Sequence, residues 1–131
     1  KPFGSEHVLV VDDEQIIAEL IESQLKRHGY KVTITTEPHE ALSLLSEDPD
    51  KFSVVITDLI MPQMSGMEVA EEIRLNWPDK PVIVCTGWNQ KVTHDQMKKS
   101  GVRAIVSKPT TMDGLAHEIR KALDSKSETH S

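Results

Sequence analysis

Carboxylate, hydroxyl and amine groups follow short apolar runs of this chain, at Asp12, Asp13, Asp58, Thr86 and Lys108. Carboxylates that lie close together repel one another, and a hard divalent cation such as Mg²⁺ relieves the repulsion by taking their oxygens as ligands. Such a cation also neutralises the oxygens of an incoming phosphoryl group. Because a carboxylate can attack a phosphoryl group and form an acyl phosphate, we predict that Asp58 is a phosphoryl acceptor.

Thr86 and Lys108 have the chemistry to complete such a site. A threonine hydroxyl can donate to one phosphoryl oxygen, and a lysine supplies a compact positive charge for another. Taken alone, each residue has a simpler explanation: Asp13 as a helix cap, Thr86 as a turn residue and Lys108 as a solvated surface charge. The combination favours a joint site, because the carboxyl ends of parallel strands all lie at one edge of a sheet.

The apolar run Val54-Val55-Ile56 is the element that must position Asp58. It is β-branched throughout, which predicts a strand buried on both faces. Asp58 stands at its carboxyl end, where open α/β sheets bind their ligands, and Pro62 closes the loop that follows. Further strands are predicted at 7–11, 31–35, 81–85 and 102–106.

Helices are expected between these strands, with start and stop signals in the sequence. Gly29 ends the first helix in the left-handed capping position, and Pro38 suits the first turn of the second. Ser65 and Glu68 have the spacing of a capping box at the start of the third. Apolar residues recur at helical spacing along the first helix, and they are expected to lie mostly in the core: Ile16, Ile17, Leu20, Ile21 and Leu25.

The alternation of strands and helices predicts a parallel α/β sheet that is covered by helices on both faces. The helix expected around residues 90–100 has few apolar residues to bury, so it should be the least firmly packed. We predict one domain over residues 7–123, a tag or linker over 1–6 and a flexible tail over 124–131.

Composition narrows the classes of function. The chain has 131 residues, which suits one domain, and a formal net charge of -6, which argues against direct nucleic-acid binding. No apolar run approaches the roughly 18 residues of a membrane helix, so no membrane contact is expected. The single cysteine, Cys85, excludes an internal disulfide and fits a reducing, cytoplasmic compartment. The histidines lack metal-ligand spacing.

Four motifs together resemble the receiver domain of two-component response regulators. They are Val10-Val11-Asp12-Asp13-Glu14, the stretch from Thr57 to Gly66, Thr86-Gly87 and Ser107-Lys108-Pro109. The resemblance covers residues 7–123, nearly the whole chain. It implies a flavodoxin-like doubly wound (βα)5 fold with a five-stranded parallel sheet in the order 2-1-3-4-5.

The resemblance also implies the ligands of a metal site. Asp58 would be the phosphoacceptor, and Mg²⁺ would be bound by Asp13, Asp58 and the backbone carbonyl of Ile60. Asp12 would act mainly through a water molecule. The phosphoryl donor would be a phosphohistidine on a histidine kinase or a histidine phosphotransfer domain, whose helical bundle would dock on the outer side of the first helix.

A conformational switch is the last feature that the resemblance implies. Thr86 would move to bond the phosphoryl group, Lys108 would pair with it, and the change would control a partner or an attached domain. Ile105 stands where the family often has Phe or Tyr, so an aromatic form of the switch is not expected. The domain is expected to be a monomer or a weak phosphorylation-dependent dimer.

Three rival functions fit the residues less well. A phosphatase of the haloacid-dehalogenase type needs an acid two positions after its nucleophile, where this chain has Ile60. A flavodoxin-like flavin binder needs a phosphate loop rich in Ser, Thr or Gly in the place of Asp12-Asp13. A pseudo-receiver, which interacts independently of phosphorylation, should have lost an acid, the Thr or the Lys. We therefore expect a signalling domain that does not turn over outside substrates.

Overall fold

One parallel sheet forms the centre of the computed structural model, which describes residues 6–86, 96, 101–102, 104–107 and 117–124. The strand order is β2-β1-β3-β4-β5, which confirms the predicted flavodoxin-like arrangement. The strands are β1 (His7–Val11), β2 (Lys31–Thr35), β3 (Val54–Asp58), β4 (Val82–Thr86) and β5 (Ala104–Ser107).

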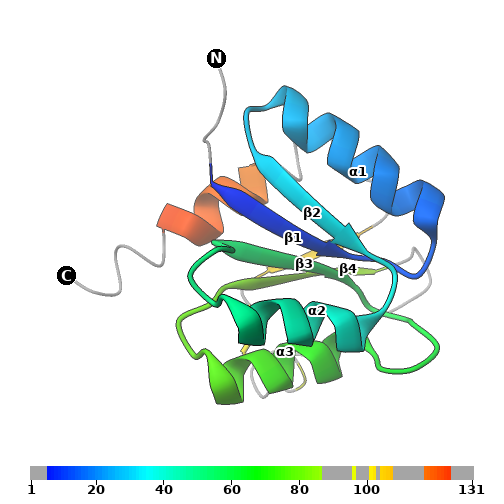
Figure 1. Cartoon of the computed structure of the whole chain (residues 1–131), viewed down its shortest axis with the longest axis vertical. Helices are drawn as coiled ribbons and strands as arrows, with labels where there is room; N and C mark the ends of the chain where they lie inside the picture. The colour runs from blue at the N-terminus through cyan, green and yellow to red at the C-terminus, as the bar shows by residue number, and fades with distance from the viewer. Residues whose placement is uncertain (1–5, 87–95, 97–100, 103, 108–116, 125–131) are drawn as a thin grey trace.

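Helices cover both faces of this sheet (Figure 1). Helix α1 (Gln15–Arg27) and a helical segment at 117–124 lie over one face. Helices α2 (Pro38–Glu47) and α3 (Gly66–Asn76) lie over the other. In the part of the chain that the structure describes, no helix has the length and apolar character needed to cross a membrane.

The helix ends follow the signals in the sequence. Pro38 is the first residue of α2, and Gly29, with a φ of 94°, follows the end of α1 in the left-handed region. The capping box before α3 is complete, because Ser65 N donates to Glu68 Oε1 at 2.9 Å and Glu68 N donates to Ser65 Oγ at 3.1 Å. Of the helix predicted around residues 90–100, only Gln96 is described, and it is helical.

Strand β3 is buried from both sides, as its apolar sequence predicts. Val55 belongs to a core cluster that includes side chains of α2 and α3. Val54 and Ile56 belong to a second cluster, with side chains of α1 and the 117–124 segment. Burying a side chain of this size stabilises the fold by about 1.5–3 kcal/mol. The strand that ends in Asp58 is therefore anchored by both layers of helices.

The prediction that the apolar side chains of α1 lie mostly in the core is partly wrong. Ile16 is 78% exposed and Leu20 is 52% exposed, whereas Ala18 and Leu25 are buried. Helix α1 contacts the sheet along one narrow stripe, so only part of its apolar surface is buried. Leu20 is turned by about 200° from Ala18 around the helix, so the two cannot face the sheet together. The outer side of α1 thus carries two large apolar side chains in solvent.

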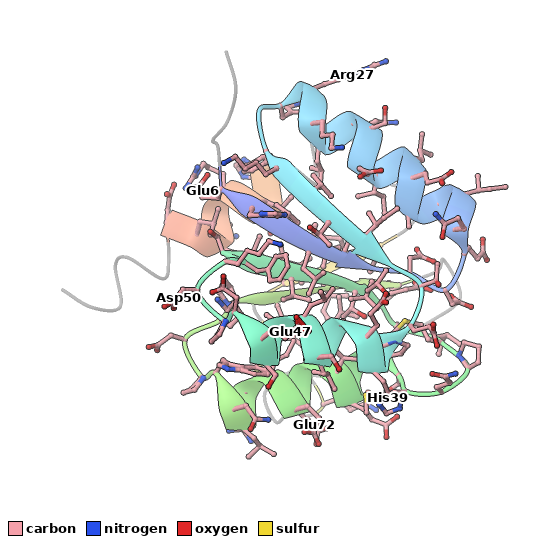
Figure 2. The ribbon with its side chains drawn as sticks, viewed as in Figure 1. Glu6, Arg27, His39, Glu47, Asp50 and Glu72 are labelled. Carbon is pink, nitrogen blue, oxygen red and sulfur yellow. The ribbon has the colours of Figure 1, made fainter. Side chains whose placement is uncertain are left out.

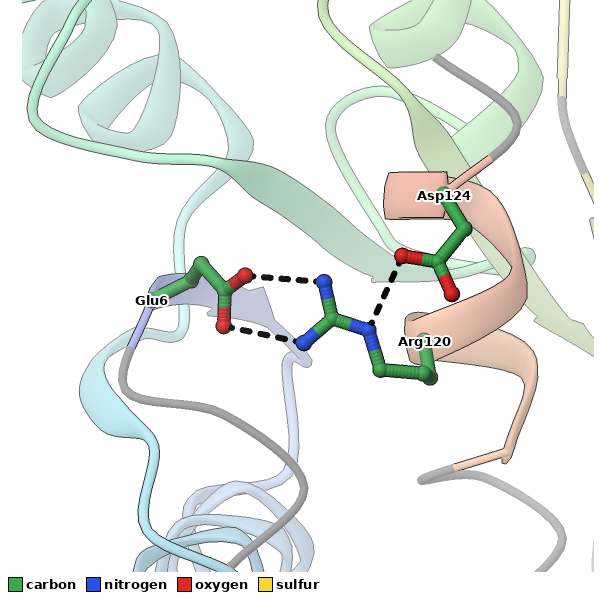
Figure 3. Close-up of polar contacts among 3 residues, drawn as sticks. All are labelled: Glu6, Arg120 and Asp124. Atoms are coloured by element: carbon green, nitrogen blue, oxygen red, sulfur yellow. Dashed lines mark hydrogen bonds and ion pairs between the residues drawn. The ribbon is translucent and has the colours of Figure 1, made fainter. Parts of the chain in front are cut away.

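An ion-pair cluster joins the start of the sheet to the 117–124 segment. Glu6 and Asp50 lie at the end of the sheet opposite the carboxyl ends of the strands (Figure 2). Arg120 donates to Glu6 through Nη1 at 3.3 Å and Nη2 at 2.9 Å, and its Nε lies 3.3 Å from Asp124 Oδ1 (Figure 3). The hydrogen bond to Glu6 raises the pKa of Arg120, so the guanidinium stays charged.

The predicted domain boundaries fall beside this cluster. Glu6, assigned to the leading tag or linker, holds Arg120, and its carbonyl also accepts from Lys31 N at 3.0 Å. Asp124, assigned to the tail, is helical. Residues 1–5 and 125–131 lie outside the described residues, so the limits of the domain stay a prediction.

Candidate functional site

Asp12, Asp13 and Asp58 lie together, as predicted from their places after β1 and at the end of β3. One carboxylate oxygen from each lies within 4.8 Å of those of the other two. The two strands are neighbours in the sheet, with Val11 paired to Thr57, so the residues that follow this pair reach the same edge. Asp12 is buried, Asp58 is half-buried and Asp13 is exposed. The cluster thus runs from the interior of the fold to solvent.

Hydrogen bonds fix Asp12 within this cluster. Asp12 N donates to Thr35 O at 3.1 Å, which ties the residue to the end of β2. Asp12 Oδ1 accepts from Glu14 N at 3.0 Å. Its side chain is therefore partly committed to the backbone, which leaves Asp13 and Asp58 as the more accessible carboxylates.

The simpler explanation of Asp13 as a helix cap is not supported. Glu14 occupies the cap position of α1, and it makes no side-chain capping bond. Asp13 precedes that position and contributes its carboxylate to the acidic cluster instead.

The main chain around Asp58 is held at several points. Thr57 Oγ1 donates to Asp58 O at 3.0 Å, and Leu59 N donates to Cys85 O at 2.9 Å across to β4. Gly66 N donates to Leu59 O at 2.8 Å and so closes the loop before α3. Ile60 lies in this loop with a side chain that is 56% exposed.

Thr86 ends β4 and is buried, with 2% of its surface exposed. Asp58 pairs with Cys85 in the sheet, so Thr86 stands one residue beyond Asp58 at the carboxyl edge. Ser107 ends β5 in register with Thr86. Lys108 follows Ser107 directly but lies outside the described residues, so its predicted contact with the phosphoryl group stays a prediction.

The donor set of the acidic cluster fits Mg²⁺. All three groups offer oxygen, which hard cations prefer, and Mg²⁺ commonly takes one or two carboxylates and keeps several waters. Ligands at about 2.1 Å in an octahedron lie about 3–4.2 Å apart. A spread of up to 4.8 Å therefore needs only small side-chain shifts, or a water between one carboxylate and the ion.

Thr57 and Gly66 stand at the two ends of a motif quoted from the sequence, but no role was predicted for either of them. Thr57 is fully buried with its hydroxyl on the Asp58 carbonyl, and Gly66 packs against the same carbonyl. Gly66 had one available signal: a glycine in the first turn of a helix is conformationally costly and invites a packing reason. Thr57 had none, because a threonine in a buried strand is common.

The sequence of this chain is similar to those of known proteins. A family model described as the response regulator receiver domain matches residues 8–120. Response regulator SaeR of Staphylococcus aureus (strain USA300) is 33% identical to this chain over 124 residues. The match takes in 95% of this chain and 53% of SaeR, so the chain spans about half the length of such curated relatives.

Solved structures share the whole architecture. A response regulator receiver domain protein from Clostridium thermocellum has a TM-score of 0.88 and 31% identity, over 95% of this chain and 98% of that one. A CheY-like receiver domain protein from Methanospirillum hungatei JF-1 has a TM-score of 0.86 and 25% identity, over 96% and 99% of the two chains.

Proposed function

The chain belongs to the response regulator receiver family of two-component systems, and on that premise we propose that Asp58 is its phosphoacceptor. Signalling by phosphorylation is general for this family. The observation that carries the assignment is the convergence of Asp12, Asp13 and Asp58 at the carboxyl edge of the sheet. Asp58 ends a strand that is buried on both faces, so its main chain is held in place at this edge of the sheet.

The transfer step is a displacement at phosphorus. A carboxylate oxygen of Asp58 forms the new P–O bond while the P–N bond to the donor histidine breaks, and the imidazole leaves with the electron pair. Hydrolysis of the acyl phosphate by water later restores the carboxylate. Thr86 donates its hydroxyl to one phosphoryl oxygen, and Lys108 places its charge beside another.

The proposed metal is Mg²⁺, which Asp13, Asp58 and the backbone carbonyl of Ile60 would hold, with Asp12 acting through a water. When bound, it neutralises charge on the phosphoryl oxygens. The carboxylates of this chain would orient the ion. The hydrogen bond from Glu14 N to Asp12 Oδ1 holds the buried carboxylate of Asp12 in place.

The exposed side of α1 is the proposed docking face for the donor. Response regulators work with histidine kinases or phosphotransfer proteins, and a donor must bring its phosphohistidine up to Asp58. Ile16 and Leu20 lie exposed on the helix that begins just after Asp13. An apolar face at this place suits the packing of a donor's helical bundle.

The output is a change of conformation that starts at Thr86. The hydroxyl shifts toward the bound phosphoryl group, and this change controls a partner or an attached domain. The segment after β4, where the sequence favours the movement, lies outside the described residues. Ile105 is half-buried against the core cluster beneath α2 and α3, and it offers no aromatic ring for the movement. The domain acts as a monomer or as a weak phosphorylation-dependent dimer.

Single residues and the net charge support the remaining proposals about substrates, nucleic acid and location. Ile60, two positions after Asp58, supplies no general acid, so the domain does not turn over outside substrates. The net charge of -6 opposes direct nucleic-acid binding. Cys85 is buried and is the one cysteine of the sequence, so it forms no internal disulfide, which suits the proposed cytoplasmic location.

A phosphotransfer assay with and without Mg²⁺ tests this function. A phosphorylated histidine kinase should transfer its label to this chain only when Mg²⁺ is present, with about one phosphoryl group per chain. A flavin binder or a pseudo-receiver would take no label, and a phosphatase would release phosphate from outside esters with repeated turnover. Either of these results would contradict the proposal.

A further inference from the structure

The first residue of α3 packs against the main chain of Asp58. A Cβ atom added at Gly66 would lie 2.3 Å from Asp58 O, 3.1 Å from Asp58 C and 3.1 Å from Leu59 Cα. Real Cβ atoms essentially never approach closer than 3.0 Å to another heavy atom. Every one of these neighbours is a backbone atom, so a side-chain rotation cannot relieve the contact.

Space, and not backbone conformation, makes glycine necessary here. Among the described glycines, positive φ angles occur at Gly29 and Gly101 and not at Gly66. The backbone of Gly66 is thus open to any residue, and only the approach to Asp58 excludes a side chain.

The surroundings give the added atom little room. The capping box of Ser65 and Glu68 fixes the first turn of α3. On the other side, Leu59 N is bonded to Cys85 O, and the Asp58 carbonyl accepts from Thr57 Oγ1. An added Cβ must therefore displace either the helix or the peptide that joins Asp58 to Leu59.

We propose that Gly66 and the Thr57 hydroxyl are positioning residues, which set the Asp58–Leu59 peptide and the loop after it at the geometry that Mg²⁺ binding requires. This inference rests on the proposed function. The loop between Leu59 and Gly66 is closed by their 2.8 Å hydrogen bond, and it contains Ile60, whose carbonyl is the proposed backbone ligand. Moving the peptide changes the distance from that carbonyl to the carboxylates of the cluster.

The test compares Mg²⁺ affinity with fold stability in Gly66→Ala and Gly101→Ala. Gly101 is a matched control, because its φ of 76° and a Cβ contact of 2.5 Å to Arg74 Cδ also strain an alanine. It precedes β5 and so lies at the opposite edge of the sheet from Asp58. Titration with Mg²⁺ alone gives Kd, and thermal unfolding without metal gives Tm.

Gly66→Ala should raise the Kd for Mg²⁺ by about 10- to 100-fold, the usual effect of disturbing groups that orient metal ligands. Gly101→Ala should lower Tm and leave Kd unchanged. Thr57→Val keeps the shape of the buried side chain and removes its hydroxyl, so it should raise Kd by a smaller factor. This variant carries the test if Gly66→Ala does not fold.

Two failures can be told apart. A wild-type chain that does not bind Mg²⁺ would overturn the proposed function itself. If the wild type binds Mg²⁺, and the variants Gly66→Ala and Thr57→Val that fold bind it with the same Kd, the positioning role alone is overturned.

Discussion

Asp12, Asp13 and Asp58 show how one residue type takes different roles through burial. Asp12 is 2% exposed, and its carboxylate accepts a hydrogen bond from Glu14 N. Asp13 is exposed, and the cap position of α1 is occupied by Glu14 instead. Three carboxylates this close repel one another when all are charged, and a cation bound at the proposed site would relieve that repulsion.

Mg²⁺ should therefore stabilise the fold by mass action. At a concentration of about 100 times its Kd, the ion should add about 2.7 kcal/mol to the free energy of unfolding. Thermal unfolding should show a rise in Tm with Mg²⁺ in the wild type and a smaller rise in Asp13→Ala. Without metal, Asp13→Ala should be at least as stable as the wild type, because one repelling charge is gone. A wild-type Tm that does not respond to Mg²⁺ would count against the site.

His7 gives the fold a dependence on pH that is separate from the acidic site. Burial against Phe52 lowers the pKa of His7 below 6.5, and Lys51 and Lys31 lower it further. Below pH 6.5 the unfolded chain binds a proton at His7 more readily than the folded chain does. The contribution of His7 to the free energy of unfolding is therefore present above pH 6.5 and is lost as the pH drops. The 2.8 Å bond between His7 Nε2 and Thr33 Oγ1 belongs to the folded state.

The substitution His7→Gln should flatten this dependence. Tm measured between pH 7.5 and 5.5 should fall less steeply in the variant than in the wild type. The exposed His39 provides a matched control, since His39→Gln also removes one imidazole. Equal slopes for the wild type and His7→Gln would show that another group sets the pH response.

Among the elements, β3 and α1 show where sequence patterns succeed and where they stop. The β-branched run of β3 predicts burial on both faces because no polar residue interrupts it, and Asp58 follows as the strand's last residue. Helix α1 has apolar residues around much of its circumference, so its pattern cannot say which of them face the sheet. Ile16 and Leu20 were expected in the core, and the packing of α1 places them in solvent.

That exposed face of α1 makes a prediction about the donor. Leu20→Ser should slow phosphotransfer from a phosphorylated kinase by about tenfold, which corresponds to about 1.4 kcal/mol of lost apolar contact. Labelling by a small acyl phosphate should be unchanged, because that donor needs no docking face. Tm should also change little, since Leu20 is 52% exposed.

Leu75→Ser is the matched control for this experiment. Leu75 is 72% exposed on α3, on the other face of the sheet from α1. Kinase-dependent transfer should be normal in this variant. An equal loss of transfer in Leu75→Ser and Leu20→Ser would mean that α1 is not the specific docking face.

Across the whole molecule, charged side chains take different arrangements at the two edges of the sheet. At the amino edge, Arg120 joins Glu6 to the 117–124 segment, and Lys80 donates to the carbonyls of Pro49 and Phe52. At the carboxyl edge, the carboxylates of Asp12, Asp13 and Asp58 converge.

The parallel sheet and the convergence of the acids could be predicted because each depends on short, local patterns and on the general geometry of parallel sheets. The strand order was predicted through the resemblance to the receiver family, and the structure confirms it. The close approach of Gly66 to Asp58 could not be predicted, since it depends on how α3 docks against β3. Nor could the bond from Arg120 to Glu6, because the two residues are 114 positions apart.

The most direct measurement of the central claim is the intact mass of the chain after treatment with a small acyl phosphate and Mg²⁺. The wild type should gain one phosphoryl group, and Asp58→Asn should gain none, because the amide keeps the shape of the side chain but is not a nucleophile. Omitting Mg²⁺ should prevent the gain in the wild type. Labelling of Asp58→Asn at the rate of the wild type would show that Asp58 is not the phosphoacceptor.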